Sequence, residues 1–231
     1  MSKVALVTGG SRGIGAATSR LLAAQGYAVA INYRSNAGAA DELCTELSAQ
    51  GFRCMAVQGD VADEAQVVSM FDVVSSTLGA ITHLVNNAGI LEQQMTLAEM
   101  SPERLQRVFA TNVTGTFLCC REAVRRMNEG GAIVNLSSVA AKLGSPGEYI
   151  DYAASKAAVD TLTIGLAREV ADRRIRVNAV RPGVIHTTRH ADGGEPGRVD
   201  RVAKTVPMRR GGQPEEVASA IAWLLSDEAS Y

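Results

Sequence analysis

The chain has 231 residues, of which 46% are apolar and 4% aromatic, and its formal net charge is −1. The near-neutral charge excludes a global field that would attract nucleic acid or an anionic membrane surface. The only apolar run near the amino end, residues 4–7, is too short for a signal-peptide core or a membrane span. We therefore expect a cytoplasmic protein with neither a nucleic-acid nor a membrane partner.

Helical and strand-like segments alternate along the chain. The first strand is expected at 3–8 and the second at 27–33, where almost every position is apolar, as in a sheet covered on both faces. Further strands are expected at 52–60, 81–89, 131–138 and 175–183, and helices at 14–25, 37–50, 64–78, 102–127, 152–171 and 214–225.

Glycines follow the first three helices, at 26, 51 and 79, as is common at helix ends. This alternation predicts an α/β fold, a single-domain Rossmann-like doubly wound parallel sheet with helices on both faces. No break in composition marks a second domain within residues 1–231. The polar, glycine-containing segment at about 184–207 is expected to be a flexible substrate lid, since long irregular segments in compact domains are usually functional.

The cysteines and histidines form no metal-binding pattern. No two of the four cysteines have Cys-x-x-Cys spacing, and no histidine lies near enough in sequence to complete a zinc site. We expect reduced thiols and no metal. His83 opens an apolar segment and is expected to be structural, whereas His186 and His190 lie in the polar segment and stay candidates for substrate contact.

A glycine-rich loop, TGGSRGIG at 8–15, connects the first strand to the first helix. Its spacing differs from both the G-x-G-x-x-G fingerprint and the phosphate loop, so alone it is also compatible with a plain turn. Its position after a strand and before a helix favours a phosphate-binding role, because the helix amino end offers free N–H groups. The loop residues expected to contact a dinucleotide are Gly9, Ser11, Arg12, Gly13, Ile14 and Gly15.

The end of the second strand indicates which dinucleotide binds. A carboxylate there would bind the adenosine ribose and repel a 2′-phosphate. The sequence instead reads Asn32, Tyr33, Arg34 and Ser35. With Arg12, this gives two guanidiniums and a hydroxyl, which suit a phosphate monoester. NADP(H) is favoured and NAD(H) is the alternative, in which Arg34 is only a solvated charge.

The YAASK stretch places Tyr152 and Lys156 four residues apart at the start of a predicted helix, on one face. A neighbouring cation stabilises a phenolate, which makes a phenol a usable acid or base near neutral pH. Ser137 and Ser138 end the preceding strand and reach the same edge of the sheet. A surface Tyr/Lys pair is the alternative interpretation.

Taken together, these motifs resemble the short-chain dehydrogenase/reductase family, and the similarity runs from Lys3 to the last residue. Six motifs agree in order and spacing: TGGSRGIG at 8–15, NNAG at 86–89, TN at 111–112, SS at 137–138, YAASK at 152–156 and RPG at 181–183. The resemblance implies a seventh strand after the last residue, so we expect the family's C-terminal strand to be missing from the sequence.

The resemblance also implies the catalytic roles. Tyr152 would exchange a proton with the substrate oxygen, and Lys156 would hold the nicotinamide ribose. Ser138 would donate a hydrogen bond to the carbonyl, with Ser137 as the alternative. Asn112 would bend its helix and seat a water in a proton relay.

Further cofactor contacts follow from the same resemblance, and Asn86 would tie neighbouring strands together. The expected contacts lie at the adenine (Asp60, Val61), the adenosine ribose (Asn87, Ala88, Gly89) and the nicotinamide (Pro182, Gly183, Ile185, Thr187).

The expected function is NADP(H)-dependent interconversion of a carbonyl and a secondary alcohol by hydride transfer. The charged lid favours a small polar carbonyl or a sugar-like alcohol, and a 3-oxoacyl thioester is a further candidate. The competing classes are a non-catalytic, dinucleotide-binding regulatory protein and a methyltransferase on a similar sheet. A homotetramer paired through the helices that carry Asn112 and Tyr152 is also expected.

Overall fold

The computed structural model describes residues 3–127 and 129–231, apart from the side chains at 189 and 190. Six parallel strands form one sheet in the order β3-β2-β1-β4-β5-β6. The strands are β1 (Val4–Thr8), β2 (Ala28–Tyr33), β3 (Cys54–Gln58), β4 (His83–Asn86), β5 (Ala132–Leu136) and β6 (Arg176–Val180). The strand order reverses between β1 and β4, where sheets of this kind form a ligand crevice.

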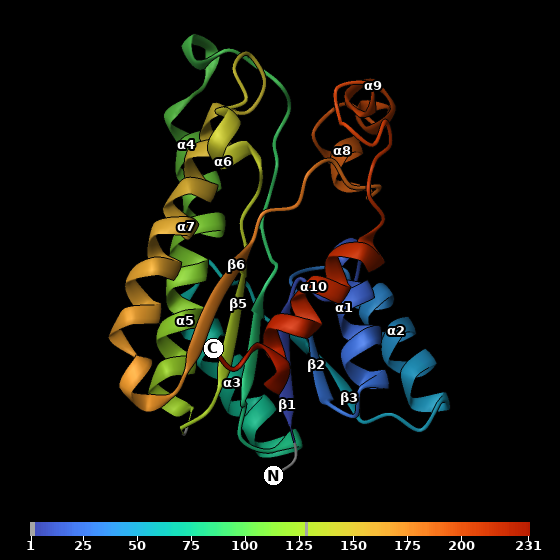
Figure 1. Cartoon of the computed structure of the whole chain (residues 1–231), viewed down its shortest axis with the longest axis vertical. Helices are drawn as coiled ribbons and strands as arrows, with labels where there is room; N and C mark the ends of the chain where they lie inside the picture. The colour runs from blue at the N-terminus through green and yellow to red at the C-terminus, as the bar shows by residue number, and fades with distance from the viewer. Residues whose placement is uncertain (1–2, 128) are drawn as a thin grey trace.

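Helices cover both faces of the sheet (Figure 1). One face carries α1 (Gly13–Ala24), α2 (Ala37–Ala49) and α10 (Pro214–Leu225), and the other α3 (Glu64–Leu78), α5 (Gly115–Arg126) and α7 (Ile150–Glu169). The geometry of β1 explains why there are two hydrophobic cores, because the side chains of successive strand residues point to opposite faces of the sheet. Val4 and Leu6 pack in the core of the α3 and α5 face, and Ala5 and Val7 in the core with α1 and α10. The predicted doubly wound α/β fold is confirmed.

The prediction of a single uninterrupted helix at 102–127 is wrong. The segment divides into α4 (Pro102–Phe109), a π-helical turn (Ala110–Thr114) and α5. The π-helical turn is centred on Asn112, whose side chain bonds to a distant loop. Single π-helical turns within helices are frequent at functional sites.

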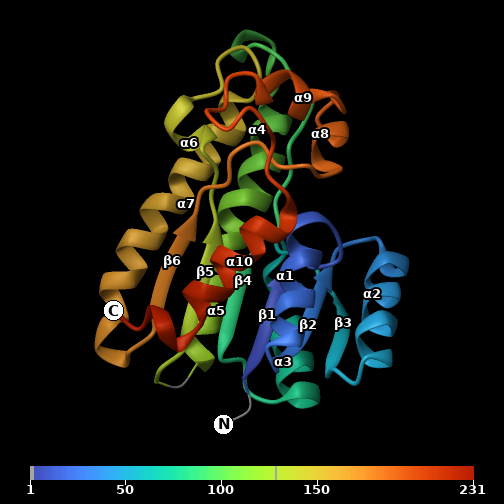
Figure 2. The same ribbon diagram turned by 45° about the vertical axis from the view of Figure 1, so that its right-hand side comes forward.

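The irregular stretch contains structure that its sequence pattern does not predict. The segment expected to form a lid, residues 184–207 and called the lid below, holds two short helices, α8 (Arg189–Asp192) and α9 (Arg198–Ala203). Both stand above the carboxyl edge of the sheet (Figure 2). A β-bridge between Ile185 and Gly212 closes the base of this segment. The remaining short elements are α6 (Ala140–Leu143) and the 3-10 turns Leu97–Glu99, Ala171–Arg173 and Asp227–Ala229.

All four cysteines are free thiols, and Cys119 and Cys120 are buried. Within the described ranges, no helix combines the length and the apolar character that a bilayer span requires.

Candidate active site

A cavity of about 420 Å³ opens at the carboxyl ends of the strands. This size is typical of small-molecule sites. Most of the residues predicted for the site line it: Gly9, Ser11, Arg12, Gly13, Ile14, Asn32, Tyr33, Arg34, Ser35, Asp60, Val61, Asn87, Ala88, Gly89, Ser137, Ser138, Tyr152, Lys156, Pro182, Gly183, Ile185 and Thr187. Gly15 and Asn112 are buried behind the cavity wall.

The glycine loop has a backbone that only glycine adopts easily. Gly9 and Gly13 have φ angles of 58° and 52°, in the left-handed region. A Cβ on Gly15 would lie 2.3 Å from the Gly9 carbonyl oxygen, so this residue permits the close packing of loop on helix. Arg12 precedes α1 without capping it through its side chain, which leaves the first N–H groups of the helix available to an anion.

Two asparagines brace this loop from neighbouring strands. Asn87 donates from Nδ2 to the carbonyl oxygens of Thr8 and Gly9, at 2.9 and 2.8 Å. Asn32 accepts from the Gly9 N–H at 3.1 Å and donates to the Gly59 carbonyl at 3.0 Å. These side chains therefore hold the loop open in addition to lining the cavity.

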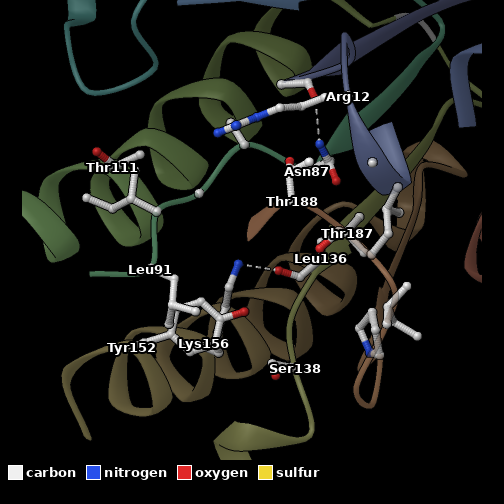
Figure 3. A pocket seen from close by; sticks show the side chains of 18 of the residues that line it. Arg12, Asn87, Leu91, Thr111, Leu136, Ser138, Tyr152, Lys156, Thr187 and Thr188 are labelled. Atoms are coloured by element: carbon white, nitrogen blue, oxygen red, sulfur yellow. Dashed lines mark hydrogen bonds between the residues drawn. The ribbon is translucent and has the colours of Figure 1, made fainter. Parts of the chain in front are cut away.

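One end of the cavity is basic. Arg12 and Arg34 both line it, and β2 ends without a carboxylate. Figure 3 shows Arg12 across the pocket from Tyr152 and Lys156. The Arg12 Nη2 atom lies 3.0 Å from Oδ2 of Asp192 in the lid, and both side chains are largely exposed.

The opposite end holds the predicted Tyr152 and Lys156. The Lys156 ammonium is buried and donates to the Leu136 carbonyl at 2.7 Å (Figure 3). Its Nζ atom lies 5.7 Å from the centroid of the Tyr152 ring. Both side chains come from the first turns of α7, so the helix supplies the phenol and the cation to the same cavity.

The two serines at the end of β5 differ in their hydrogen bonds. Ser137 donates its hydroxyl proton to the Lys156 carbonyl at 3.1 Å. The Ser138 oxygen accepts from the Ala140 N–H at 3.1 Å, which leaves its own O–H able to donate into the cavity. This difference favours Ser138 over Ser137 as the partner of a substrate oxygen.

Asn112 links the π-helical turn to the loop after β4. Its amide oxygen accepts from the Ile90 N–H at 2.7 Å, and its Nδ2 donates to the Ile90 carbonyl at 3.0 Å and to Ser155 at 3.1 Å. The side chain is thus fully engaged in holding the cavity wall, and a water seated by this residue stays a prediction.

Asn86, His83 and His186 do not line the cavity. Asn86 donates from Nδ2 to Asn135 of the neighbouring β5 at 2.8 Å, as its expected strand-tying role requires. His83 is buried against Tyr27, and desolvation lowers its pKa to about 4, as suits a structural residue. His186 does not line the cavity and its ring lies beside Gly211, while the side chain of His190 lies outside the described residues.

Several cavity residues were missed by the sequence analysis. The lining of the cavity also includes apolar and aromatic side chains that belong to no motif: Leu91, Val139, Leu143, Tyr149 and Val202. Of these residues, Tyr149 could have been predicted from its spacing, since it lies one helical turn before Tyr152.

The charges of the lid are largely paired with each other and with the adjacent loop. Glu148 binds Arg198 at 2.6 Å and Arg201 at 2.8 Å, and Glu195 binds the same two arginines. Gln94 also donates to Glu195. Only Arg198 of this cluster lines the cavity.

The arrangement fits a dinucleotide phosphate. Open helix N–H groups, a glycine loop and two arginines occupy one end, while a phenol, an ammonium and a hydroxyl occupy the other. Among the described residues, no group of three or more His, Cys, Asp or Glu side chains could hold a metal ion.

Comparison with known proteins agrees with this geometry. A family profile described as enoyl-(acyl carrier protein) reductase matches residues 9–231. The chain is 60% identical to the uncharacterized oxidoreductase YgfF of Escherichia coli (strain K12), covering 99% of this chain and 94% of the relative. It is 40% identical to the 3-oxoacyl-[acyl-carrier-protein] reductase FabG of Staphylococcus aureus (strain N315), covering 100% and 94%.

Solved structures show the same relationship. A short chain dehydrogenase from Burkholderia cenocepacia J2315, determined in complex with NADP, superposes with a TM-score of 0.93 at 36% identity, covering 99% of this chain and 92% of that one. The chain therefore belongs to the short-chain dehydrogenase/reductase family.

Proposed function

We propose that this protein is an NADP(H)-dependent oxidoreductase that interconverts a carbonyl and a secondary alcohol. One observation carries the proposal: Tyr152, Lys156 and Ser138 line the same cavity as the basic end with Arg12 and Arg34. That cavity can hold a nucleotide at one end and a reacting carbonyl at the other.

The bound NADPH would supply the hydride to the carbonyl carbon, and the protein would do the rest. Ser138 would donate a hydrogen bond to the carbonyl oxygen, and Tyr152 would give it a proton as negative charge develops. Lys156 would stabilise the phenolate that remains, since its ammonium lies beside the ring. Asn112 would hold the wall opposite α7 through Ile90 and Ser155.

The preference for NADP(H) rests on charge. Arg34 at the end of β2 and Arg12 in the glycine loop can both bind a 2′-phosphate, and no carboxylate of β2 repels it. The relative from Burkholderia cenocepacia was solved with NADP, which supports the same choice.

The substrate would carry an apolar group next to its carbonyl. Aliphatic side chains, Leu91, Val139, Leu143 and Val202, line the cavity that Tyr152 also lines. The charged lid residues Glu195, Arg198 and Arg201 are already paired. A sugar would leave its hydroxyls facing apolar atoms, which is unfavourable without hydrogen-bond partners. A 3-oxoacyl thioester is the second candidate, because the relative FabG is a 3-oxoacyl-[acyl-carrier-protein] reductase.

Transfer of deuterium tests the proposal. The protein is incubated with 4-deuterated NADPH, labelled at both C4 positions, and a panel of aliphatic ketones, 3-oxoacyl thioesters and sugars, and the products are analysed by mass spectrometry. We expect one deuterium on the carbinol carbon of an apolar substrate. Tight NADPH binding without label in any product would favour the non-catalytic binding protein instead.

Location in the cytoplasm and assembly as a homotetramer are parts of the same proposal. Phe117 of α5 and Ile164 of α7 are about half exposed on the helices expected to pair. Burial of these side chains against a second copy would remove apolar surface from water. Light scattering after gel filtration gives the mass of the assembly.

A further inference from the structure

A buried ion pair lies behind the cavity, between α4 and the start of α7. Arg104 donates from Nε to Oδ2 of Asp151 at 2.7 Å and from Nη2 to Oδ1 at 3.2 Å. The two side chains are only 4% and 1% exposed. Transfer of such a pair from water into the protein interior costs free energy, so a contribution to stability does not by itself explain why the pair is buried here.

The pair reaches the backbone of Tyr152 directly. Asp151 is the residue before Tyr152, and its Oδ1 atom accepts the Tyr152 N–H at 2.8 Å. This N–H lies in the first turn of α7, where no carbonyl of the same helix can accept it. The carboxylate also carries the charge that a helix amino end favours.

The same guanidinium holds the opposite wall. Arg104 donates from Nη1 to the Gln93 carbonyl, in the loop that also presents Leu91 to the cavity. A Cβ on Gly194 of the lid would lie 3.6 Å from Cγ of Gln93, so the lid rests on this loop. One side chain therefore connects α4, the wall of the cavity and the turn that presents the phenol.

We propose that Arg104 and Asp151 are positioning residues, which orient the Tyr152 hydroxyl toward the carbonyl oxygen. The inference rests on the proposed function, since it concerns the delivery of a proton by that phenol. Neither side chain lines the cavity, so both act through Tyr152 and through the Gln93 loop.

A structural role and a positioning role make different predictions for one double variant. Replacement of a buried ion pair by apolar residues of similar volume is often neutral or stabilising. Arg104→Met with Asp151→Leu is therefore expected to fold, but Tyr152 loses its N–H acceptor and the Gln93 carbonyl loses its bond to Arg104. Because small misplacement of a reacting group can cost about a hundredfold in rate, we expect kcat to fall by about 10- to 100-fold.

A matched control comes from the same helix. Arg107 of α4 binds Glu92 of the same loop through two hydrogen bonds, at 2.9 and 3.0 Å, but this pair is more exposed and does not reach α7. The double variant Arg107→Met with Glu92→Leu removes an equal number of charges. It should keep the wild-type kcat.

The experiment measures four quantities for each protein: the melting temperature, the Kd of NADPH, kcat on a ketone that the wild type reduces, and the isotope effect on kcat with 4-deuterated NADPH. The inference predicts a wild-type melting temperature and Kd, a lower kcat and a larger isotope effect for the Arg104/Asp151 variant only. Equal kcat values in the two double variants would overturn it.

If the Arg104/Asp151 variant does not fold, Asp151→Asn decides. This variant keeps an oxygen near the Tyr152 N–H but weakens the hold of Arg104. A reduced kcat at unchanged NADPH affinity supports the inference, and a wild-type kcat overturns it. A wild type that reduces no carbonyl in the panel would instead contradict the proposed function.

Discussion

The ion pair between Arg12 and Asp192 connects the proposed phosphate-binding end of the cavity to the lid. Its Nη2 and Oδ2 atoms are 3.0 Å apart. A 2′-phosphate that binds Arg12 would compete with this carboxylate for the same guanidinium. Asp192→Asn removes the charge and keeps the shape of the side chain, so we expect NADP⁺ to bind more tightly to this variant.

The exposure of the pair sets the size of the effect. The Arg12 and Asp192 side chains are 62% and 46% exposed, so the pair is well solvated. Exposed ion pairs contribute about 0.2–1 kcal/mol, which corresponds to an affinity change of about 1.5- to 5-fold. NAD⁺ lacks the 2′-phosphate and should show no such gain. The ratio of the NAD⁺ Kd to the NADP⁺ Kd should therefore rise by the same factor.

Calorimetric titration of both coenzymes measures this ratio. Asp200→Asn is the control, since Asp200 is an exposed carboxylate on α9 of the same lid. The difference between the variants should shrink in about 1 M salt, where the Debye length is about 3 Å. A ratio equal to that of the Asp200→Asn control, or equal shifts for both coenzymes, would refute competition at Arg12.

Three further predictions concern stability, the loop and coenzyme choice. Burial lowers the pKa of His83 to about 4, whereas a free histidine titrates near 6.5. Between these pH values only the unfolded chain binds the proton, so the free energy of unfolding should fall as the pH drops, by up to about 3 kcal/mol. When unfolding by urea is measured, the His83→Gln variant should lack this pH dependence. Gly15→Ala places a Cβ 2.3 Å from the Gly9 carbonyl oxygen, and overpacking of this kind should weaken NADPH binding by about tenfold or more; an unchanged Kd would contradict the close packing. Arg34→Asp should weaken NADP⁺ binding by about 10- to 100-fold and leave NAD⁺ binding unchanged or tighter; an equal loss for both coenzymes would argue against a phosphate contact.

The architecture was predictable because the order of strands and helices can be inferred from local sequence patterns. Apolar runs such as 4–7 and 28–31 alternate with amphipathic helices, and parallel strands bring their carboxyl ends to one edge. Residues that follow those strands, including Arg34 and Ser138, therefore meet in one cavity although they are far apart in sequence.

The parts that were not predictable depend on contacts between distant segments. The family resemblance implied a bend at Asn112, but no local pattern predicts that it takes the form of a π-helical turn, which is accompanied by bonds from this residue to Ile90. The two short lid helices are held by ion pairs with distant residues: α9 through Arg198 and Arg201 with Glu148, and α8 through Asp192 with Arg12. The pairing of Arg104 with Asp151 likewise joins residues that no local pattern relates.

The measurement closest to the central claim is a single-turnover rate with saturating NADPH and a ketone, for wild type and Tyr152→Phe. Loss of a general acid usually costs about 10²- to 10⁴-fold in rate, while the phenyl ring still fills its place in the cavity wall. We predict a rate lower by that factor at an unchanged NADPH Kd. Equal rates for the two proteins would contradict proton donation by Tyr152.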